Sequence, residues 1–241
     1  MAKLQCLRYG PRVTEALPFL DPINAIPGVR AAWIGRIPGL EIMGDRTVAM
    51  EQLRPIHEAA VEEFAGIGAA WWRAEQVHGT EVAIVPGTAT MDAPDGLPVV
   101  SGVDGLLTNE PGVVLAIYVA DCGPIWLADR ATGAIGLLHS GKKGTEGNIL
   151  AHALETMRLK FGTRPENVTV VLGPCIRPPQ YDVDFAAEIG RQAGAAGVRD
   201  FHDLGENTGA DLEKHYSYRM EKGITGRMMA LIRKEEVHHL P

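Results

Sequence analysis

The chain has 241 residues and a formal net charge of −7 at pH 7; 46% of its residues are hydrophobic and 22% are charged. These values are typical of a globular protein long enough to bury a substantial core. The acidic balance supplies no overall positive field for nucleic acid or an anionic membrane, and no stretch is apolar for long enough to span a bilayer. We therefore expect no nucleic-acid or membrane partner, and only a local anion site.

The cysteine content and the N-terminus predict a cytoplasmic protein. Cys6, Cys122 and Cys175 are an odd number of cysteines without the spacing of a disulfide framework, so reduced thiols are expected. The first ten residues lack the continuous apolar segment of a signal peptide. The sequence carries no signal for an oligomeric state.

The first half of the chain predicts a mixture of strands and one helix. Apolar residues in Glu51–Phe64 recur at the spacing of one helical face. The elements expected here are an irregular lead-in (1–30), an edge strand (31–37), the helix (51–64), a strand that opens at Trp71 and ends in 76–80, and an extended segment (81–85) stopped by Pro86-Gly87.

The second half alternates buried strands with helices. The expected elements are strands at 103–107 and 113–120, a hairpin of two apolar runs around the turn 130–133, a helix at 149–161, a strand at 167–172 and a helix at 185–196. Tyr216–Arg219 and Thr225–Ile232 are predicted as a strand, a turn and a closing helix. Because no repeat, linker or composition change divides the chain, we expect one mixed α/β domain over residues 1–241.

The hairpin carries the residues with the most distinctive chemistry. One apolar run begins with Asp121 and Cys122, and the second ends on His139. The turn between the runs predicts that the thiol and the imidazole are neighbours in space. Cysteine and histidine together are ligands for zinc or copper, and they also form nucleophile–base pairs.

His78 is a third candidate for the same site. Taken singly, a histidine such as His78 is more often a hydrogen-bonding structural residue than a ligand. Cys122 alone could be an inert buried residue, and His139 alone could be a helix cap or a solvated side chain. All three, however, lie where strands give way to glycine-containing loops, the usual place for sites on α/β scaffolds. For Asp104 and Asp121 the sequence leaves three roles open: orienting a ligand, acting as an acid or base, and capping a turn.

A glycine-rich basic loop follows His139. It reads Ser140-Gly-Lys-Lys-Gly-Thr-Glu-Gly147, and a helix expected to begin near Glu146 follows it. Ser140, Gly141, Lys142, Lys143 and Gly144 are candidates for binding phosphate, because glycines allow close backbone approach and the lysines supply charge. The order of residues is not that of a Walker A loop. The alternative is a solvated turn with two surface lysines.

Several short motifs occur together along the chain: Gln76–Gly79, Asp104–Thr108, Ala120–Pro124, His139–Gly141, Gly173–Ile176, Tyr216–Arg219 and Thr225–Arg227. In this order they resemble the motifs of the laccase-domain proteins, a family also called multicopper polyphenol oxidase-like or purine nucleoside phosphorylase-like proteins. The family usually reads His-Ala-Gly-Trp-Arg-Gly where this chain reads His139-Ser-Gly-Lys-Lys-Gly144. A lysine there replaces a bidentate arginine by a point charge.

The resemblance implies a four-layer α/β/β/α sandwich with mixed sheets. It also implies a zinc ion held by His78, Cys122 and His139, with copper as the other metal attributed to the family. The implied activities are phosphorolysis of inosine, guanosine, adenosine or methylthioadenosine, and deamination of adenosine. Copper-dependent phenol oxidation is attributed to some members.

We therefore expect a zinc-dependent enzyme acting on a purine nucleoside and phosphate. A cysteine hydrolase or amidase is an alternative, with Cys122 as nucleophile, His139 as base and Asp121 or a backbone carbonyl as the orienting group. A non-catalytic metal-binding protein is another. A phenol oxidase is disfavoured, because one cysteine and two histidines do not supply the ligands of several coppers.

Overall fold

Two β-sheets packed face to face form the centre of the protein in the computed structural model, which describes residues 17–91, 93 and 95–235. The five-stranded sheet has the order β1 (Val29–Ile34), β11 (Met228–Lys234), β6 (Val114–Val119), β2 (Trp71–Ala74), β4 (Val99–Val100). The six-stranded sheet has the order β10 (Asp200–Asp203), β9 (Val168–Leu172), β7 (Gly123–Asp129), β8 (Ile135–Ser140), β5 (Gly105–Thr108), β3 (Val82–Ile84). Both sheets mix parallel and antiparallel pairs.

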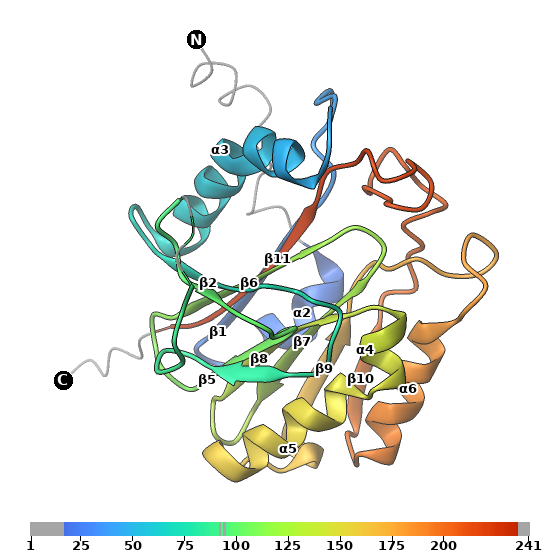
Figure 1. The fold of residues 1–241 in the computed structure, drawn as a ribbon. Coiled ribbons are helices and arrows are strands. Elements are labelled where there is room, and N and C mark those ends of the chain that lie inside the picture. The colour runs from blue at the N-terminus through green and yellow to red at the C-terminus, as the bar shows by residue number, and fades with distance from the viewer. Residues whose placement is uncertain (1–16, 92, 94, 236–241) are drawn as a thin grey trace.

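Helices cover the outer faces of both sheets, which completes the predicted four-layer α/β/β/α sandwich (Figure 1). Helix α3 (Arg46–Ala65) packs on the five-stranded sheet, while α5 (Ile149–Phe161) and α6 (Phe185–Ala195) cover the six-stranded sheet. The short elements are η1 (Pro18–Leu20), α2 (Asp21–Asn24), α4 (Lys142–Glu146) and η2 (Pro165–Asn167). None of the helices in the described ranges combines the length and apolar character needed to cross a bilayer.

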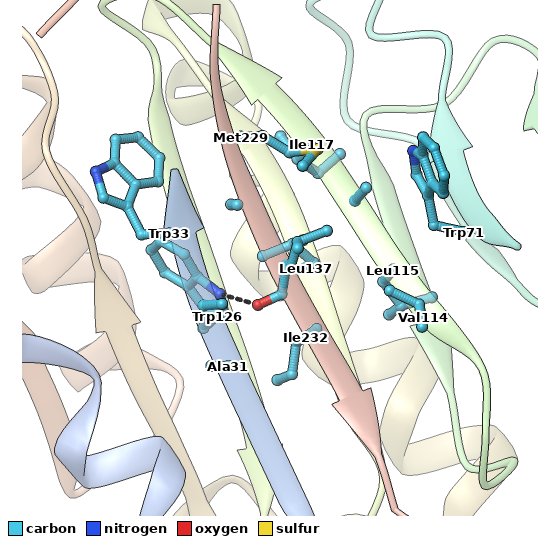
Figure 2. Close-up of a cluster of buried hydrophobic side chains, with 14 of the residues drawn as sticks. Ala31, Trp33, Trp71, Val114, Leu115, Ile117, Trp126, Leu137, Met229 and Ile232 are labelled. Atoms are coloured by element: carbon cyan, nitrogen blue, oxygen red, sulfur yellow. Dashed lines mark hydrogen bonds between the residues drawn. The ribbon is translucent and has the colours of Figure 1, made fainter. Parts of the chain in front are cut away.

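The core between the sheets explains why their strands lack polar alternation. Every residue of β6 is buried, because the partner sheet covers one face and α3 the other. Trp126 of β7 is fully buried and its indole Nε1 donates to the carbonyl of Leu231 in β11 at 2.9 Å (Figure 2). Trp33 meets the edge of the Trp126 ring at a centroid distance of 6.0 Å. The indole therefore joins the two sheets by packing and by a hydrogen bond.

The predicted hairpin is confirmed and sets the geometry of the candidate site. Strands β7 and β8 are antiparallel, with Gly123 opposite Ser140 and Pro124 opposite His139. At the other end, the buried Asp129 carboxylate accepts hydrogen bonds from Ala131 N at 2.8 Å and Thr132 Oγ1 at 2.7 Å, which fixes the turn. The register brings Cys122, which directly precedes β7, beside the end of β8.

Three local expectations were wrong. The closing helix is instead β11, a central strand whose apolar run has no polar face because it is covered on both sides. Tyr216–Arg219 lies in a turn region and is not a strand. Helix α3 begins at Arg46 because the Asp45 side chain caps it, accepting from Thr47 N and Val48 N. The edge strand and the helix at 149–161 are confirmed.

The lead-in predicted over residues 1–30 is only partly visible. Its first sixteen residues lie outside the described residues, and the rest contains η1, α2 and the start of β1. The assignment of all 241 residues to one domain stays a prediction.

Replacing Trp126 with phenylalanine should destabilise the sandwich. The variant loses the hydrogen bond to Leu231 and part of the packing between the sheets, so we expect the free energy of unfolding to fall by about 1–3 kcal/mol. Urea unfolding followed by circular dichroism measures this. Trp72→Phe is the control, since Trp72 is only partly buried; equal destabilisation by the two substitutions would contradict the structural role of the Trp126 indole.

Candidate metal centre and substrate cavity

Two imidazoles and one thiol converge at the end of the β7–β8 hairpin. His78 lies in the loop between β2 and β3, Cys122 precedes β7, and His139 lies on β8. Their ligand-type atoms all lie within 4.8 Å of one another. The two imidazole rings are 4.8 Å apart between centroids and meet at 77°. The structure thus brings together the three residues that the sequence singled out.

The carboxylate of Asp104 organises this cluster. Asp104 is fully buried; Oδ1 accepts from His78 N at 2.9 Å and lies 2.7 Å from His139 Nδ1, while Oδ2 accepts from Gly79 N at 2.6 Å. Its own carbonyl accepts from His139 N at 2.7 Å. Because Nδ1 of His139 is engaged by the carboxylate, Nε2 is the nitrogen left for the cluster.

Asp121, the other candidate carboxylate, has a different place. Its Oδ1 accepts from Thr208 Oγ1 at 2.7 Å and its Oδ2 from Arg219 N at 2.8 Å. Its carbonyl accepts from Ile176 N at 2.8 Å. Asp121 therefore links the loops that carry Ile176, Thr208 and Arg219. The carboxylate that orients His139 is Asp104 rather than Asp121.

The backbone around the cluster is held in an unusual conformation. Gln76, His78 and Asp121 have φ values of 64°, 63° and 85°, in the left-handed region that residues other than glycine rarely adopt. The Gln76 side chain compensates by acting as a strand partner for Tyr118, accepting from its N–H at 2.9 Å and donating to its carbonyl at 2.5 Å. These bonds fix the direction in which the chain enters the His78 turn.

Electrostatic coupling favours the thiolate of Cys122 and the imidazolium of His139. Burial opposes ionisation of the Cys122 thiol, but the charge of His139 and hydrogen bonds with His139 and His78 lower its pKa from 9.0 to about 6. Burial likewise opposes protonation of His139, yet the thiolate and Asp104 raise the pKa of this imidazole from 6.5 to about 9. Cys175 differs, since burial raises its pKa to about 12 and keeps it a neutral thiol beneath the site.

The glycines of the basic loop are required by close packing. A Cβ on Gly141 would lie 2.6 Å from Cys122 Sγ, one on Gly144 would lie 3.2 Å from the carbonyl of Gly79, and one on Gly147 would lie 2.4 Å from Thr80 Cγ2. Substitution of Gly141 would therefore push against the thiol itself. The loop packs directly on the two segments that carry Cys122 and His78.

The helix expected to begin near Glu146 instead consists of two pieces. Helix α4 begins at Lys142 and has five residues, and Asn148, with φ at 57°, separates it from α5 and caps α5 by accepting from Ala151 N. Ser140 is buried and its hydroxyl contacts Thr145 Oγ1 at 2.9 Å. Of the five predicted phosphate-binding residues, Gly141, Lys142 and Lys143 line the cavity beside the cluster, whereas Ser140 and Gly144 are packing residues.

The cavity has a volume of about 830 Å³ and a strongly positive wall. Asp121 is the single carboxylate among its described lining residues, and four aromatic residues, Tyr118, Tyr181, Phe185 and Tyr218, supply apolar surface. The cationic lining residues are Arg46, Lys142, Lys143, Arg219, Lys222 and Arg227. Local positive charge thus gathers in a protein with a net charge of −7.

Four of these cations, Arg46, Arg219, Lys222 and Arg227, were not expected at the site from the sequence. Arg219 and Arg227 belong to motifs that carry the family resemblance, and these motifs could have indicated that the two arginines lie at the site. Arg46 and Lys222 had no signal, because their placement depends on the packing of α3 and of the loop before β11.

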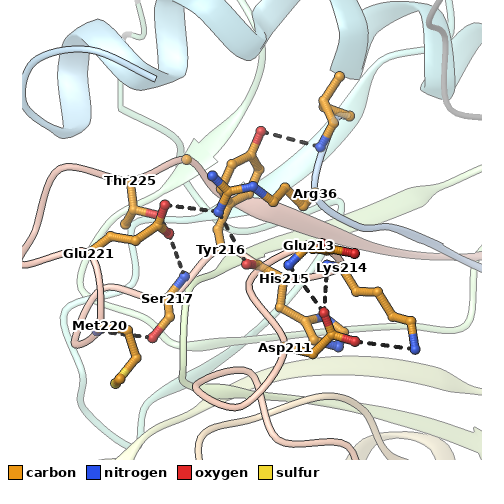
Figure 3. A network of polar contacts seen from close by, with 12 residues as sticks. Arg36, Asp211, Glu213, Lys214, His215, Tyr216, Ser217, Met220, Glu221 and Thr225 are labelled. Carbon is orange, nitrogen blue, oxygen red and sulfur yellow. Dashed lines mark hydrogen bonds and ion pairs between the residues drawn. The ribbon is translucent and has the colours of Figure 1, made fainter. Parts of the chain in front are cut away.

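A polar network fixes the loop that carries Arg219, Lys222 and Arg227 (Figure 3). The Glu221 carboxylate accepts from Arg36 Nη1 at 2.8 Å, Ser217 N at 3.0 Å and Thr225 Oγ1 at 2.6 Å. The Arg36 guanidinium also stands 4.7 Å from the centroid of the buried Tyr216 ring. The loop therefore has a defined shape despite its lack of helix or strand.

Two curated bacterial proteins are similar to this chain over most of their length. One from Geobacillus stearothermophilus, named purine nucleoside phosphorylase YlmD, is 30% identical over 231 residues, covering 82% of this chain and 83% of that protein. One from Deinococcus radiodurans, named purine nucleoside phosphorylase, is 38% identical over 211 residues, covering 74% of this chain and 77% of that protein.

Solved structures and a family profile agree with these similarities. The crystal structure of YlmD from Geobacillus stearothermophilus matches with a TM-score of 0.68 and 26% identity, over 88% of this chain and 93% of that chain. That of Bacillus licheniformis hypothetical protein YfiH matches with a TM-score of 0.73 at 19% identity, over 86% and 93%, which supports the fold alone. The profile described as multi-copper polyphenol oxidoreductase laccase matches residues 43–191 and 180–235. The chain therefore belongs to this laccase-like family.

Proposed function

We propose that the protein is a zinc-dependent purine nucleoside phosphorylase. The observation that carries the proposal is the convergence of His78, Cys122 and His139 at a cavity with a cationic wall. The relatives named purine nucleoside phosphorylase support the choice of substrate. Inosine, guanosine, adenosine and methylthioadenosine are the nucleosides to be tested, and adenosine deamination stays a prediction from the resemblance.

The donor set suits zinc. Zinc accepts thiolate and imidazole ligands at about 2.0–2.3 Å, and three protein ligands leave one position open, as in catalytic sites. The lowered pKa of Cys122 favours the thiolate. Asp104 holds Nδ1 of His139, so Nε2 is the ligand atom, and it must release its proton when the ion binds because the pKa of His139 is raised. The ligand-type atoms, within 4.8 Å of one another, are close enough to share one ion. Zinc bound there would act as a Lewis acid on a substrate oxygen. One cysteine and two histidines supply too few ligands for several coppers.

Phosphorolysis requires phosphate and nucleoside side by side. An oxygen of phosphate forms a bond to the anomeric carbon while the bond from that carbon to the purine nitrogen breaks; the nitrogen keeps the electron pair and is protonated. The cationic wall would hold the phosphate and offset its charge, and the rings of Tyr181 and Tyr218 offer surface for the purine. Held together in one cavity, the two reactants need no further diffusional encounter.

A cysteine hydrolase is the second candidate, because Cys122, His139 and Asp104 form a thiolate–imidazolium–carboxylate series. In that reaction the sulfur would attack an acyl carbon, and His139 would give its proton to the leaving group. A thiolate that ligates zinc is not free to attack. The hydrolase therefore requires a reactive Cys122 thiolate, whereas the zinc enzyme requires a thiolate that the ion keeps unreactive.

Elemental analysis of the purified protein should find about one zinc per chain. His78→Ala, Cys122→Ala and His139→Ala should each lower zinc content sharply while circular dichroism shows a folded protein. His152→Ala, at an exposed position on α5, is the control and should keep its zinc. Full zinc content in all three cluster variants would remove the proposed ligand set.

Thiol alkylation separates the metalloenzyme from the hydrolase. The zinc-loaded protein should resist iodoacetamide at Cys122, and the chelated protein should react with a midpoint near pH 6, because the thiolate forms above the lowered pKa of about 6. Rapid alkylation of the zinc-loaded protein with parallel loss of activity would favour the hydrolase instead.

Lys142→Ala and Lys143→Ala should each raise the phosphate KM for inosine cleavage, by about two- to fivefold. The effect is modest because both side chains are exposed and Lys142 lies 3.8 Å from Glu146. Lys160→Ala on the exposed face of α5 is the control, and adenosine deamination is measured in parallel as a reaction that needs no phosphate. Unchanged phosphate KM in both variants would make these lysines surface charges only.

A further inference from the structure

Three arginines line the cavity, and none of them makes an ion pair with a carboxylate among the described residues. Arg219 packs on Tyr181, with its guanidinium 5.0 Å from the ring centroid. Arg46 lies at the start of α3 and Arg227 just before β11. Arg227 Nη1 donates only to backbone carbonyls, those of Thr225 at 3.2 Å and Gly226 at 2.8 Å. Most donors of both guanidinium groups are therefore free for a ligand.

The guanidinium groups of Arg46 and Arg227 line the same cavity. Burial lowers the pKa of Arg227, and the charge of Arg46 lowers it further. Asp121 is the lining carboxylate, and both of its oxygens are already engaged. Glu75 lies within range of Arg46 but accepts hydrogen bonds from Ser101 and Gly102. Uncompensated positive charge in a partly buried place is unfavourable unless an anion occupies it.

These arginines offer a stronger anion site than the lysines of α4. Guanidinium groups bind phosphate oxygens in a bidentate way, whereas a lysine presents a single point charge. Arg227 is half-buried, whereas Arg46, Lys142 and Lys143 are exposed, so solvent screens Arg227 least. Arg227 is therefore the strongest anion-binding group, and its bidentate geometry, which Arg46 shares, favours the two arginines over the lysines.

The Arg227 side chain and the backbone of Arg46 are held in place before any ligand arrives. The Arg227 guanidinium lies 5.9 Å from the centroid of the Tyr218 ring, and its loop is fixed by the Glu221 network (Figure 3). The backbone of Arg46 is fixed by the Asp45 cap of α3. Prior ordering of the binding groups reduces the entropic cost of binding.

We propose that Arg46 and Arg227 form the main phosphate-binding site of the cavity. The ligand group is a phosphate dianion, supplied either as inorganic phosphate or as the phosphate ester of a nucleotide. Binding of the phosphate group does not depend on the proposed function. Only the choice of a nucleotide as the phosphate ester rests on it. Arg227 and the His78–Cys122–His139 cluster line the same cavity, so a phosphate bound to Arg227 would share that cavity with the cluster.

Calorimetric titration of the purified, metal-loaded protein tests the site with three probes: inorganic phosphate, inosine and inosine 5′-monophosphate. Arg46→Ala and Arg227→Lys should weaken phosphate binding at least about tenfold, and Lys142→Ala less than about fivefold. Arg54→Ala is the matched control, because Arg54 lies on the same helix but does not line this cavity. Arg227→Lys keeps the charge and guards against an effect caused only by misfolding.

The probes distinguish the two sources of phosphate. If inosine 5′-monophosphate binds at least tenfold more tightly than inosine and loses this advantage in Arg46→Ala, the site takes a nucleotide; if only inorganic phosphate depends on Arg46, it takes the co-substrate. Either result supports the proposal. Wild-type affinity for both phosphate probes in both arginine variants, or a larger loss in Lys142→Ala, would overturn it. Arginine-dependent phosphate binding without inosine cleavage would support this site and refute the proposed function.

Discussion

The hydrogen bonds of the Asp104 carboxylate are the interaction on which the candidate site depends. Its two oxygens engage the backbone of His78 and Gly79 and the imidazole of His139, so one buried group sets both histidine-bearing segments. Burial opposes its ionisation, but these hydrogen bonds keep the pKa of Asp104 below its ordinary value. Since the β7–β8 hairpin independently places Cys122 beside His139, a local turn and one carboxylate together assemble a cluster from three distant parts of the sequence.

The second organising feature is the separation of charge within an acidic protein. The cations that line the cavity come from α3, α4 and the loop before β11, and the layers of the sandwich bring these segments to one edge. The loop before β11 owes its shape to Glu221 and Arg36 rather than to regular secondary structure. The cations of α3 and of the loop before β11 thus come from segments other than those that carry the His78–Cys122–His139 cluster, whereas α4 packs directly on the cluster.

Local patterns in the sequence predicted the hairpin, the buried strands and the helix at 149–161, because turn residues and apolar periodicity act within a few residues of each other. They failed for β11, since a short apolar run fits a buried strand and a buried helix equally well until its neighbours β1 and β6 are known. Asp121 attracted attention through its place beside Cys122, whereas Asp104 reaches His139 only through the pairing of β5 with β8. Arg46 could not be assigned, because nothing local connects the start of α3 with the cavity.

Zinc affinity of Asp104→Asn, measured by competition with a chelator, tests the central claim most directly. Asparagine cannot accept all the hydrogen bonds that the carboxylate accepts, so zinc should bind about 10–100-fold more weakly while the protein stays folded. Asp129→Asn, which changes a buried carboxylate at the opposite end of the same hairpin, should keep wild-type zinc affinity even if it lowers stability. Equal zinc affinity in wild type and Asp104→Asn would contradict the account.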